Sequence, residues 1–301
     1  MDLAGIAHHY YSQNHKVMYI TALKTISPQP TCDESLFHGN YTTHTGNKYN
    51  AQEPDYTGLI NPNLLRRMGK SIRMGIGAGF PLLQGEKNID GIILGSSEGG
   101  LEDCIKFLNQ IVTYKEGTLT PTNFVQSTPN ALAGSLALMS QNTCYNITHV
   151  HKGLAFENSL IDALLLFEEG KANTILVGNV EEISDYNFNI ETLAGKFKAR
   201  ETTSENLLTS NTEGTVCGEG SSMFILQANA TEYFARILDV EQISYPTEEE
   251  INDVIHTLLE KNHLAPNDID ALVLGYNGDS RPDFWYTNVI DSVFPEQAIY
   301  T

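Results

Sequence analysis

The sequence predicts an α/β fold in which helices cover a sheet of mainly buried strands. Short apolar runs typical of buried strands alternate along the chain with longer segments of helical periodicity. In addition, the run IDGIILG at 89–95 is echoed by IDALVLG at 269–275, each directly after a predicted helix. That echo indicates two related halves, of which the second is expected to be incomplete.

The first predicted strand covers residues 17–23 (VMYITAL) and is followed by a polar loop over 27–60. Asn61-Pro62 then opens a helix, because a capping residue precedes a proline. Its apolar face is formed at helical spacing by Leu64, Leu65, Met68, Ile72 and Ile76. The glycine-rich run at 75–79 is predicted to end this helix. It is not a dinucleotide fingerprint, since it does not follow a strand.

The remaining elements alternate in type. Strands are predicted at 89–95, 144–150, 173–180, 214–227, 234–243 and 269–275, and helices at 101–112, 129–139, 153–169 and from Thr247 onward. Thr247 and Glu250 form a capping box for the last helix. The run GEGSS at 218–222 is interpreted as a tight hairpin. We therefore expect an N-terminal extension (1–17), a first half (18–228) and a partial second half (229–301).

Composition disfavours several classes of function. The chain of 301 residues carries 18 Lys and Arg against 37 Asp and Glu, a net charge of −19, so nucleic acids and anionic membranes would repel it. No stretch approaches the roughly 20 apolar residues of a membrane span, and no secretory signal opens the sequence. Four scattered cysteines without CxxC spacing indicate reduced thiols in a cytoplasmic protein.

Four segments in order carry a family resemblance. They are MYITALKTISP at 18–28, the run from IDGIILGSSEGGLED at 89 to PTNFVQSTPNALAGSLAL ending at 138, LIDALLLFEEGKANTILVGNVEE at 160–182, and GTVCGEGSSMFILQ at 214–227. Together they resemble the β-ketoacyl synthases, the thiolase-like condensing enzymes. The resemblance extends from about residue 18 to 292 and implies a thiolase-like αβαβα sandwich.

The same resemblance places the residues of the family's active site. Counting back from Gly170 by the family's spacing puts Gly153 where the nucleophilic cysteine would stand. Asn277 replaces the first catalytic histidine, and the second would fall beyond Thr301. A thiolate must take up the acyl chain, and the histidines must stabilise developing negative charge. Glycine cannot do the first, and asparagine carries no positive charge, so the resemblance implies no condensing activity of the chain's own.

Family members with this loss are the chain-length factors of polyketide systems and the similar subunits of aryl polyene and flexirubin pathways. They pair with an active ketosynthase in a heterodimer whose interface shapes the tunnel for the growing chain. The resemblance is closest to the aryl polyene type. It implies an active ketosynthase as partner and, through it, an acyl carrier protein, with no cofactor or metal. Phe124 is then a candidate wall or gate of the tunnel.

Other hypotheses stay open at this point. His151 lies next to the ancestral site and could serve an active acyltransferase with a rebuilt site, although a strand-end histidine bonded to backbone is the simpler interpretation. His149 shares its strand face, but no third metal ligand is close in sequence. Cys144 and Cys217 are interpreted as small core residues, with Cys144 also considered as a displaced nucleophile. A third hypothesis is a structural paralogue that only stabilises a synthase complex.

Overall fold

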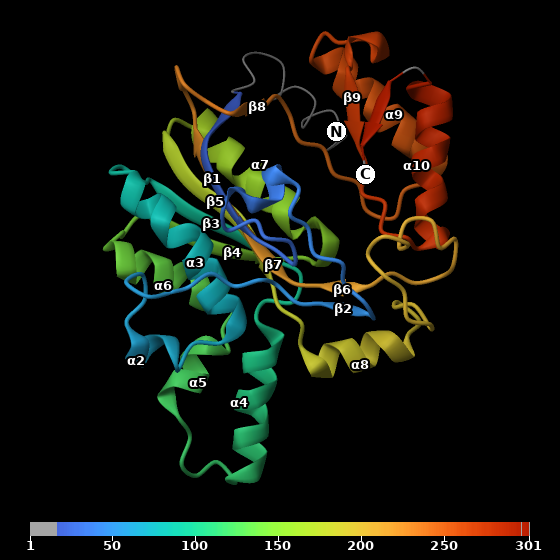
Figure 1. Ribbon diagram of the computed structural model, residues 1–301. Coiled ribbons are helices and arrows are strands. Elements are labelled where there is room, and N and C mark those ends of the chain that lie inside the picture. The colour runs from blue at the N-terminus through green and yellow to red at the C-terminus, as the bar shows by residue number, and fades with distance from the viewer. Residues whose placement is uncertain (1–16, 296, 301) are drawn as a thin grey trace, which may run out of the picture.

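A six-stranded mixed sheet forms the centre of the computed structural model, which describes residues 17–295 and 297–300 (Figure 1). The strand order is β4-β3-β5-β7-β1-β8. These strands are β1 (Met18–Ile26), β3 (Gly91–Ser96), β4 (Tyr145–Val150), β5 (Thr174–Glu181), β7 (Gly220–Gln227) and β8 (Ala235–Ile237). Strand β3 pairs in parallel with β4 and β5, whereas β7 pairs antiparallel with β5 and β1. The extension predicted over 1–17 falls, except for Val17, outside the described residues.

Helices cover both faces of this sheet. On one face, α3 (Lys70–Gly85) and α6 (Ala131–Ser140) pack on Ile92 and Leu94 of β3. On the other, α7 (Ala155–Glu168) packs on Ile93. Successive strand side chains point to opposite faces, so the continuous apolar runs predicted as buried strands are those that serve both cores.

Further elements lie around the sheet. They are η1 (Glu34–His38), β2 (Lys48–Tyr49), α2 (Pro62–Leu65), α4 (Leu101–Thr113), α5 (Pro121–Gln126), η2 (Lys152–Leu154), α8 (Asp185–Leu193) and β6 (Cys217–Gly218). In Figure 1, α4 and α5 project together from one end of the body. Along the described residues, none of the helices combines the length and apolar character needed to cross a membrane.

Four predictions about elements are wrong. The strand expected over 234–243 is limited to the three residues of β8. The helix expected from Pro62 is two helices, because α2 ends at Leu65 and Gly69 caps a new helix. The glycine-rich run 75–79 lies inside α3 and does not end it. The run 218–222 is no hairpin, because β6 pairs in parallel with β2, and β7 pairs with β1 and β5.

The C-terminal unit (residues 247–295 and 297–300) lies beside the main body in Figure 1. It contains α9 (Glu248–Lys261), η3 (Pro266–Asp268), β9 (Ala271–Val273), α10 (Ser280–Val293) and β10 (Ala298–Tyr300). Strands β9 and β10 pair in parallel, and the capping box predicted at Thr247 and Glu250 is confirmed. The predicted boundary after residue 228 falls between β7 and β8, two strands of one sheet, and the division into halves stays a prediction.

The glycine at 95 lets the backbone of α7 approach the sheet directly. A Cβ at Gly95 would lie 2.7 Å from the carbonyl oxygen of Ala155, the first residue of α7. We therefore expect Gly95→Ala to lower the free energy of unfolding by about 1–3 kcal/mol, since backbone must move to relieve the overlap.

Urea denaturation of Gly95→Ala and Gly134→Ala provides the measurement and its matched control. Gly134 lies inside α6, and a Cβ there would meet nothing within 4 Å. Gly134→Ala should therefore stabilise the protein by up to about 1 kcal/mol through helix propensity. Equal effects of the two substitutions would contradict the close approach of α7.

Candidate functional site

The predicted nucleophile position lies where β4 passes into α7. His151 precedes the one-turn helix η2, and Lys152 adopts a left-handed backbone with φ of 48°. Lys152 forms an ion pair with Glu98. Gly153 follows, and a Cβ built on it meets nothing within 4 Å. There is thus room for a side chain at Gly153, but glycine offers no group that could carry an acyl chain.

The two histidines of this region have different partners. His151 Nδ1 lies 2.8 Å from the side-chain nitrogen of Asn158, so its partner is a side chain and not the backbone group expected. His149 Nε2 lies 2.9 Å from a carboxylate oxygen of Asp162. In the described part of the chain, no group of three or more His, Cys, Asp or Glu side chains is arranged to hold a metal ion.

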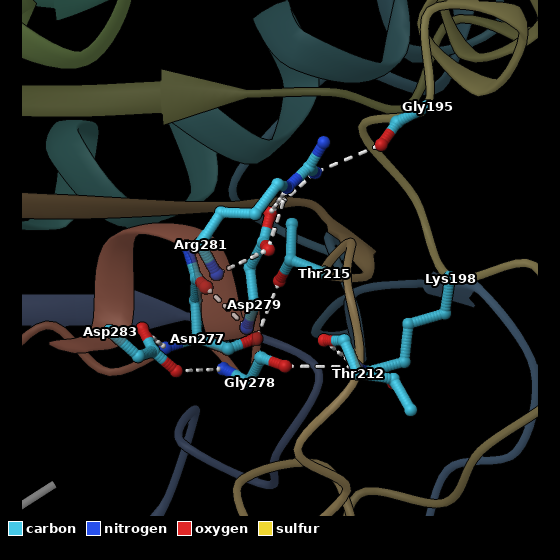
Figure 2. A network of polar contacts seen from close by, with 9 residues as sticks. All are labelled: Gly195, Lys198, Thr212, Thr215, Asn277, Gly278, Asp279, Arg281 and Asp283. Carbon is cyan, nitrogen blue, oxygen red and sulfur yellow. Dashed lines mark hydrogen bonds and ion pairs between the residues drawn. The ribbon is translucent and has the colours of Figure 1, made fainter.

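The backbone N–H groups of segment 277–279, which contains the predicted first-histidine position, are bound by nearby side chains of the same chain (Figure 2). The side-chain oxygen of Asn277 accepts a hydrogen bond from the backbone N–H of Asp279 at 3.0 Å. Asp283 accepts from the backbone N–H of Asn277 at 3.3 Å and from that of Gly278 at 2.9 Å. Three successive N–H groups are therefore occupied. An oxyanion or enolate would find a carboxylate here in place of donors.

Asp279 places a second carboxylate, after that of Asp283, at this segment. Asp279 is buried, and its hydrogen bond from Arg281 holds the pKa of its carboxyl at about 2, so it is ionised at neutral pH. The same carboxylate caps α10 by accepting from the backbone N–H of Arg281 at 3.1 Å. The positive charge of Arg281 is thus paired with the carboxylate of Asp279.

Two small cavities lie at the carboxyl ends of β3 and β5. Each measures about 20 Å³, and Ser71, Ser96, Gly100 and Val180 line both. That volume suits about one water molecule and is far too small for an acyl chain.

Two glutamates follow each other at the end of β5. Burial is the main reason why the pKa of Glu181 and of Glu182 is raised to about 7. Glu182 also accepts a hydrogen bond from the backbone N–H of Ser71 in the first turn of α3. These carboxyls were not among the candidate residues of the sequence.

Phe124 lies on α5, 58% exposed, with its ring centroid 5.5 Å from that of Phe107 on α4. It is absent from the lining of both small cavities, and its role in a tunnel wall stays a prediction.

Cys144 is exposed, so its interpretation as a core residue is wrong. Burial raises the pKa of Cys217 to about 11, which keeps it a neutral thiol at physiological pH.

Comparison with known proteins shows the family to which this chain belongs. Residues 40–200, more than half of the chain, match the family described as the N-terminal domain of β-ketoacyl synthases. The chain therefore belongs to the β-ketoacyl synthase family. A search of curated proteins finds no match.

Solved structures agree on the fold. A type II polyketide synthase ketosynthase complex, AntDE:AntF, has a TM-score of 0.71 at 14% identity, covering 95% of this chain and 80% of that one. The ishigamide ketosynthase/chain length factor has a TM-score of 0.68 at 18% identity, covering 92% and 82%. A β-ketoacyl synthase from Burkholderia phymatum STM815 has a TM-score of 0.68 at 17% identity, covering 94% and 80%. The predicted thiolase-like fold is confirmed.

Proposed function

We propose that this chain is a non-catalytic, chain-length-determining partner of an active β-ketoacyl synthase. Acyl and malonyl groups would reach the partner subunit on an acyl carrier protein. The observation that carries the proposal is the state of segment 277–279, whose N–H groups are bound by Asn277 and Asp283 of the chain itself. Together with glycine at 153, it leaves the chain with neither a nucleophile nor anion stabilisation at the two predicted positions.

The exposed edge of β4 and the exposed apolar residues of α4 and α5 support pairing with another subunit. Strand β4 lies at an edge of the six-stranded sheet, with Tyr145 and Val150 exposed at its two ends. An exposed edge strand offers unpaired backbone groups to a second chain. Helix α4 exposes Leu108 and Val112, and the neighbouring α5 exposes Phe124. A heterodimer that covers the β4 edge together with α4 and α5 would bury these side chains.

The product class is the finer part of the proposal. One solved relative is a ketosynthase, ApeO, in complex with its chain length factor, ApeC, from Xenorhabdus doucetiae, with a TM-score of 0.51 and 18% identity over 71% of this chain and 80% of that one. That relative pairs a chain length factor with a ketosynthase, the arrangement proposed for this chain. The aryl polyene or flexirubin-like product rests on the resemblance of the sequence to the aryl polyene type.

Co-expression with an active ketosynthase of such a pathway tests the function. We expect a heterodimer on size-exclusion chromatography and condensation of malonyl-carrier only when both proteins are present. His151→Ala should leave that activity unchanged. Gly153→Cys should leave the isolated chain inactive, because the anionic segment 277–279 persists. Condensation by this chain alone, abolished by His151→Ala, would instead establish an enzyme with a rebuilt active site.

Product length separates the proposal from a purely structural role. If Phe124 lines the tunnel in the heterodimer, Phe124→Ala should change the length distribution of the products while the heterodimer remains intact. Leu193→Ala is a matched control, since Leu193 at the end of α8 is also exposed but lies on another helix. Unchanged products in both variants would favour the structural paralogue.

A further inference from the structure

The C-terminal unit has an apolar core of its own. Its cluster of Leu259, Val293 and Phe294, with their partly buried neighbours, draws only on residues between 255 and 294. Among the described residues, the two clusters of the six-stranded sheet share no member with it. Hydrophobic burial therefore stabilises each part separately, and other contacts must couple them.

Polar contacts between two segments supply that coupling (Figure 2). Lys198 is only 4% exposed, and its ammonium donates to the carbonyl of Thr212 at 3.2 Å, to the hydroxyl of Thr212 at 2.8 Å and to the carbonyl of Gly278 at 2.8 Å. An ammonium has three N–H donors, so this set of neutral acceptors uses its full capacity. Burial lowers the pKa of Lys198, as expected for a cation removed from water.

The backbone of Lys198 belongs to the main body. Its N–H donates to the carbonyl of Thr215 at 2.9 Å, and its carbonyl accepts from the side chain of Asn47 at 2.6 Å. The preceding Phe197 stacks on Phe188 of α8, with ring centroids 4.8 Å apart. The side chain thus extends from a fixed point of the body to the segment that contains Asn277.

Three weaker contacts run parallel to it. The hydroxyl of Thr215 donates to the carbonyl of Asn277 at 2.7 Å. The backbone N–H of Ser280 donates to the carbonyl of Thr212 at 3.2 Å, and Arg281 donates to the carbonyl of Gly195 at 2.9 Å. These three contacts involve exposed or half-buried groups, whereas the bond from Lys198 to Gly278 is buried.

A separate contact joins α9 to the segment after β8, whose Val240 packs in the core of the main body. There the side chain of Asp239, 4% exposed, pairs with Lys261 at 2.8 Å and accepts a hydrogen bond from Asn262 at 3.2 Å.

We propose that Lys198 is a positioning residue that fixes segment 277–279 and, through it, couples the C-terminal unit to the main body. Its buried ammonium reaches a backbone carbonyl of that segment, whereas the two apolar cores share no member. The proposal goes beyond the chain-length role and holds whether or not the chain pairs with a ketosynthase.

The only tryptophan of the chain provides a local probe. Trp285 lies on α10, so its fluorescence reports on the C-terminal unit, while far-ultraviolet circular dichroism is dominated by the larger body. In urea, the wild-type chain should give coincident transitions by the two methods. In Lys198→Met, the fluorescence transition should move to lower urea than the circular dichroism transition. Amide exchange over residues 276–283 should rise about tenfold, the factor expected for the loss of a hydrogen bond from a charged donor.

Two further variants complete the test. Lys196→Met is the matched control, because Lys196 is exposed, two residues away, and pairs with Glu191 at the surface. It should leave the two transitions coincident. Thr215→Val removes only the hydroxyl bond to Asn277 and should separate the transitions less than Lys198→Met; it serves also if Lys198→Met fails to fold. Transitions that stay coincident in both Lys198→Met and Thr215→Val, or that already differ in the wild type, would overturn the proposal.

Discussion

Replacing Glu219 with glutamine is expected to lower the free energy of unfolding by about 3 kcal/mol, the scale on which a buried ion pair is lost. The side chain of Glu219 is fully buried. One of its oxygens accepts from the ammonium of Lys70 and from the backbone N–H of Ala51, and the other accepts from the backbone N–H of Ile183. A glutamine keeps one oxygen and points an amide group at a donor, so at least one bond is replaced by a repulsive contact.

The measurement is urea denaturation followed by circular dichroism. Asp185→Asn is the matched control, because it removes the same charge from an exposed pair with Lys48. Exposed pairs contribute little, so its midpoint should stay close to that of the wild type. If Glu219→Gln were as mild as Asp185→Asn, the buried pair would not be a source of stability. The effect matters for the site because Glu219 fixes the residues that flank Glu182 and the first turn of α3.

The parts of the fold that the sequence predicted well are those buried on both faces. Every residue of β3 is buried, so its apolar run has no polar interruption and is recognised easily. The wrong prediction at α2 has a physical cause. Leu65 and Met68 continue the period of α3 and pack against the same cluster, although the chain breaks between the helices. The periodicity of apolar residues indicates which side chains are buried and does not show whether the helix is continuous. Gly69 was the only sequence signal for the break between α2 and α3.

Long-range pairing could not be predicted from local pattern. The run 214–227 contains two strands, β6 and β7, whose partners β2, β1 and β5 lie far away in sequence. A local hairpin was the simplest interpretation of its glycines. The exposure of Cys144 has a similar origin, because it precedes β4, and the position of β4 at a sheet edge follows from topology.

The sequence predicted which residues replace the family's catalytic residues. It did not predict the charged side chains that surround them. Gly153 and Asn277 could be named from the family's spacing, and their assignment stays a prediction. The contacts of Asp283 and Lys198 depend on how α10 and the loop before β6 meet in space. One local signal existed, since Asp279 followed by Pro282 is typical of a helix start, and α10 begins at Ser280.

Lowering the pH from about 8 to about 5.5 is expected to stabilise the protein, contrary to the usual effect of acid. The pKa of Glu181 and of Glu182 is raised from 4.5 to about 7. Between these values the folded state holds protons that the unfolded state has released, so the free energy of unfolding rises as pH falls through 7. The gain is complete near the unfolded pKa and amounts to at most about 3 kcal/mol for each carboxyl, at about 1.4 kcal/mol per pKa unit.

Carboxyls with a lowered pKa make the protein less stable as pH falls, but only at lower pH. Hydrogen bonds lower the pKa of Asp279 to about 2, so the stability it contributes is lost below the unfolded value of 3.8, outside this window. Urea midpoints at the two pH values test the prediction in the wild type and in Glu182→Gln. The amide keeps an acceptor for the N–H of Ser71 but cannot titrate, so the pH dependence should fall by about half. An unchanged pH dependence in Glu182→Gln would show that Glu182 is ionised in the folded protein, and a wild type no more stable at the lower pH would show the same for both carboxyls. That result would place two further negative charges beside the cavities at the ends of β3 and β5.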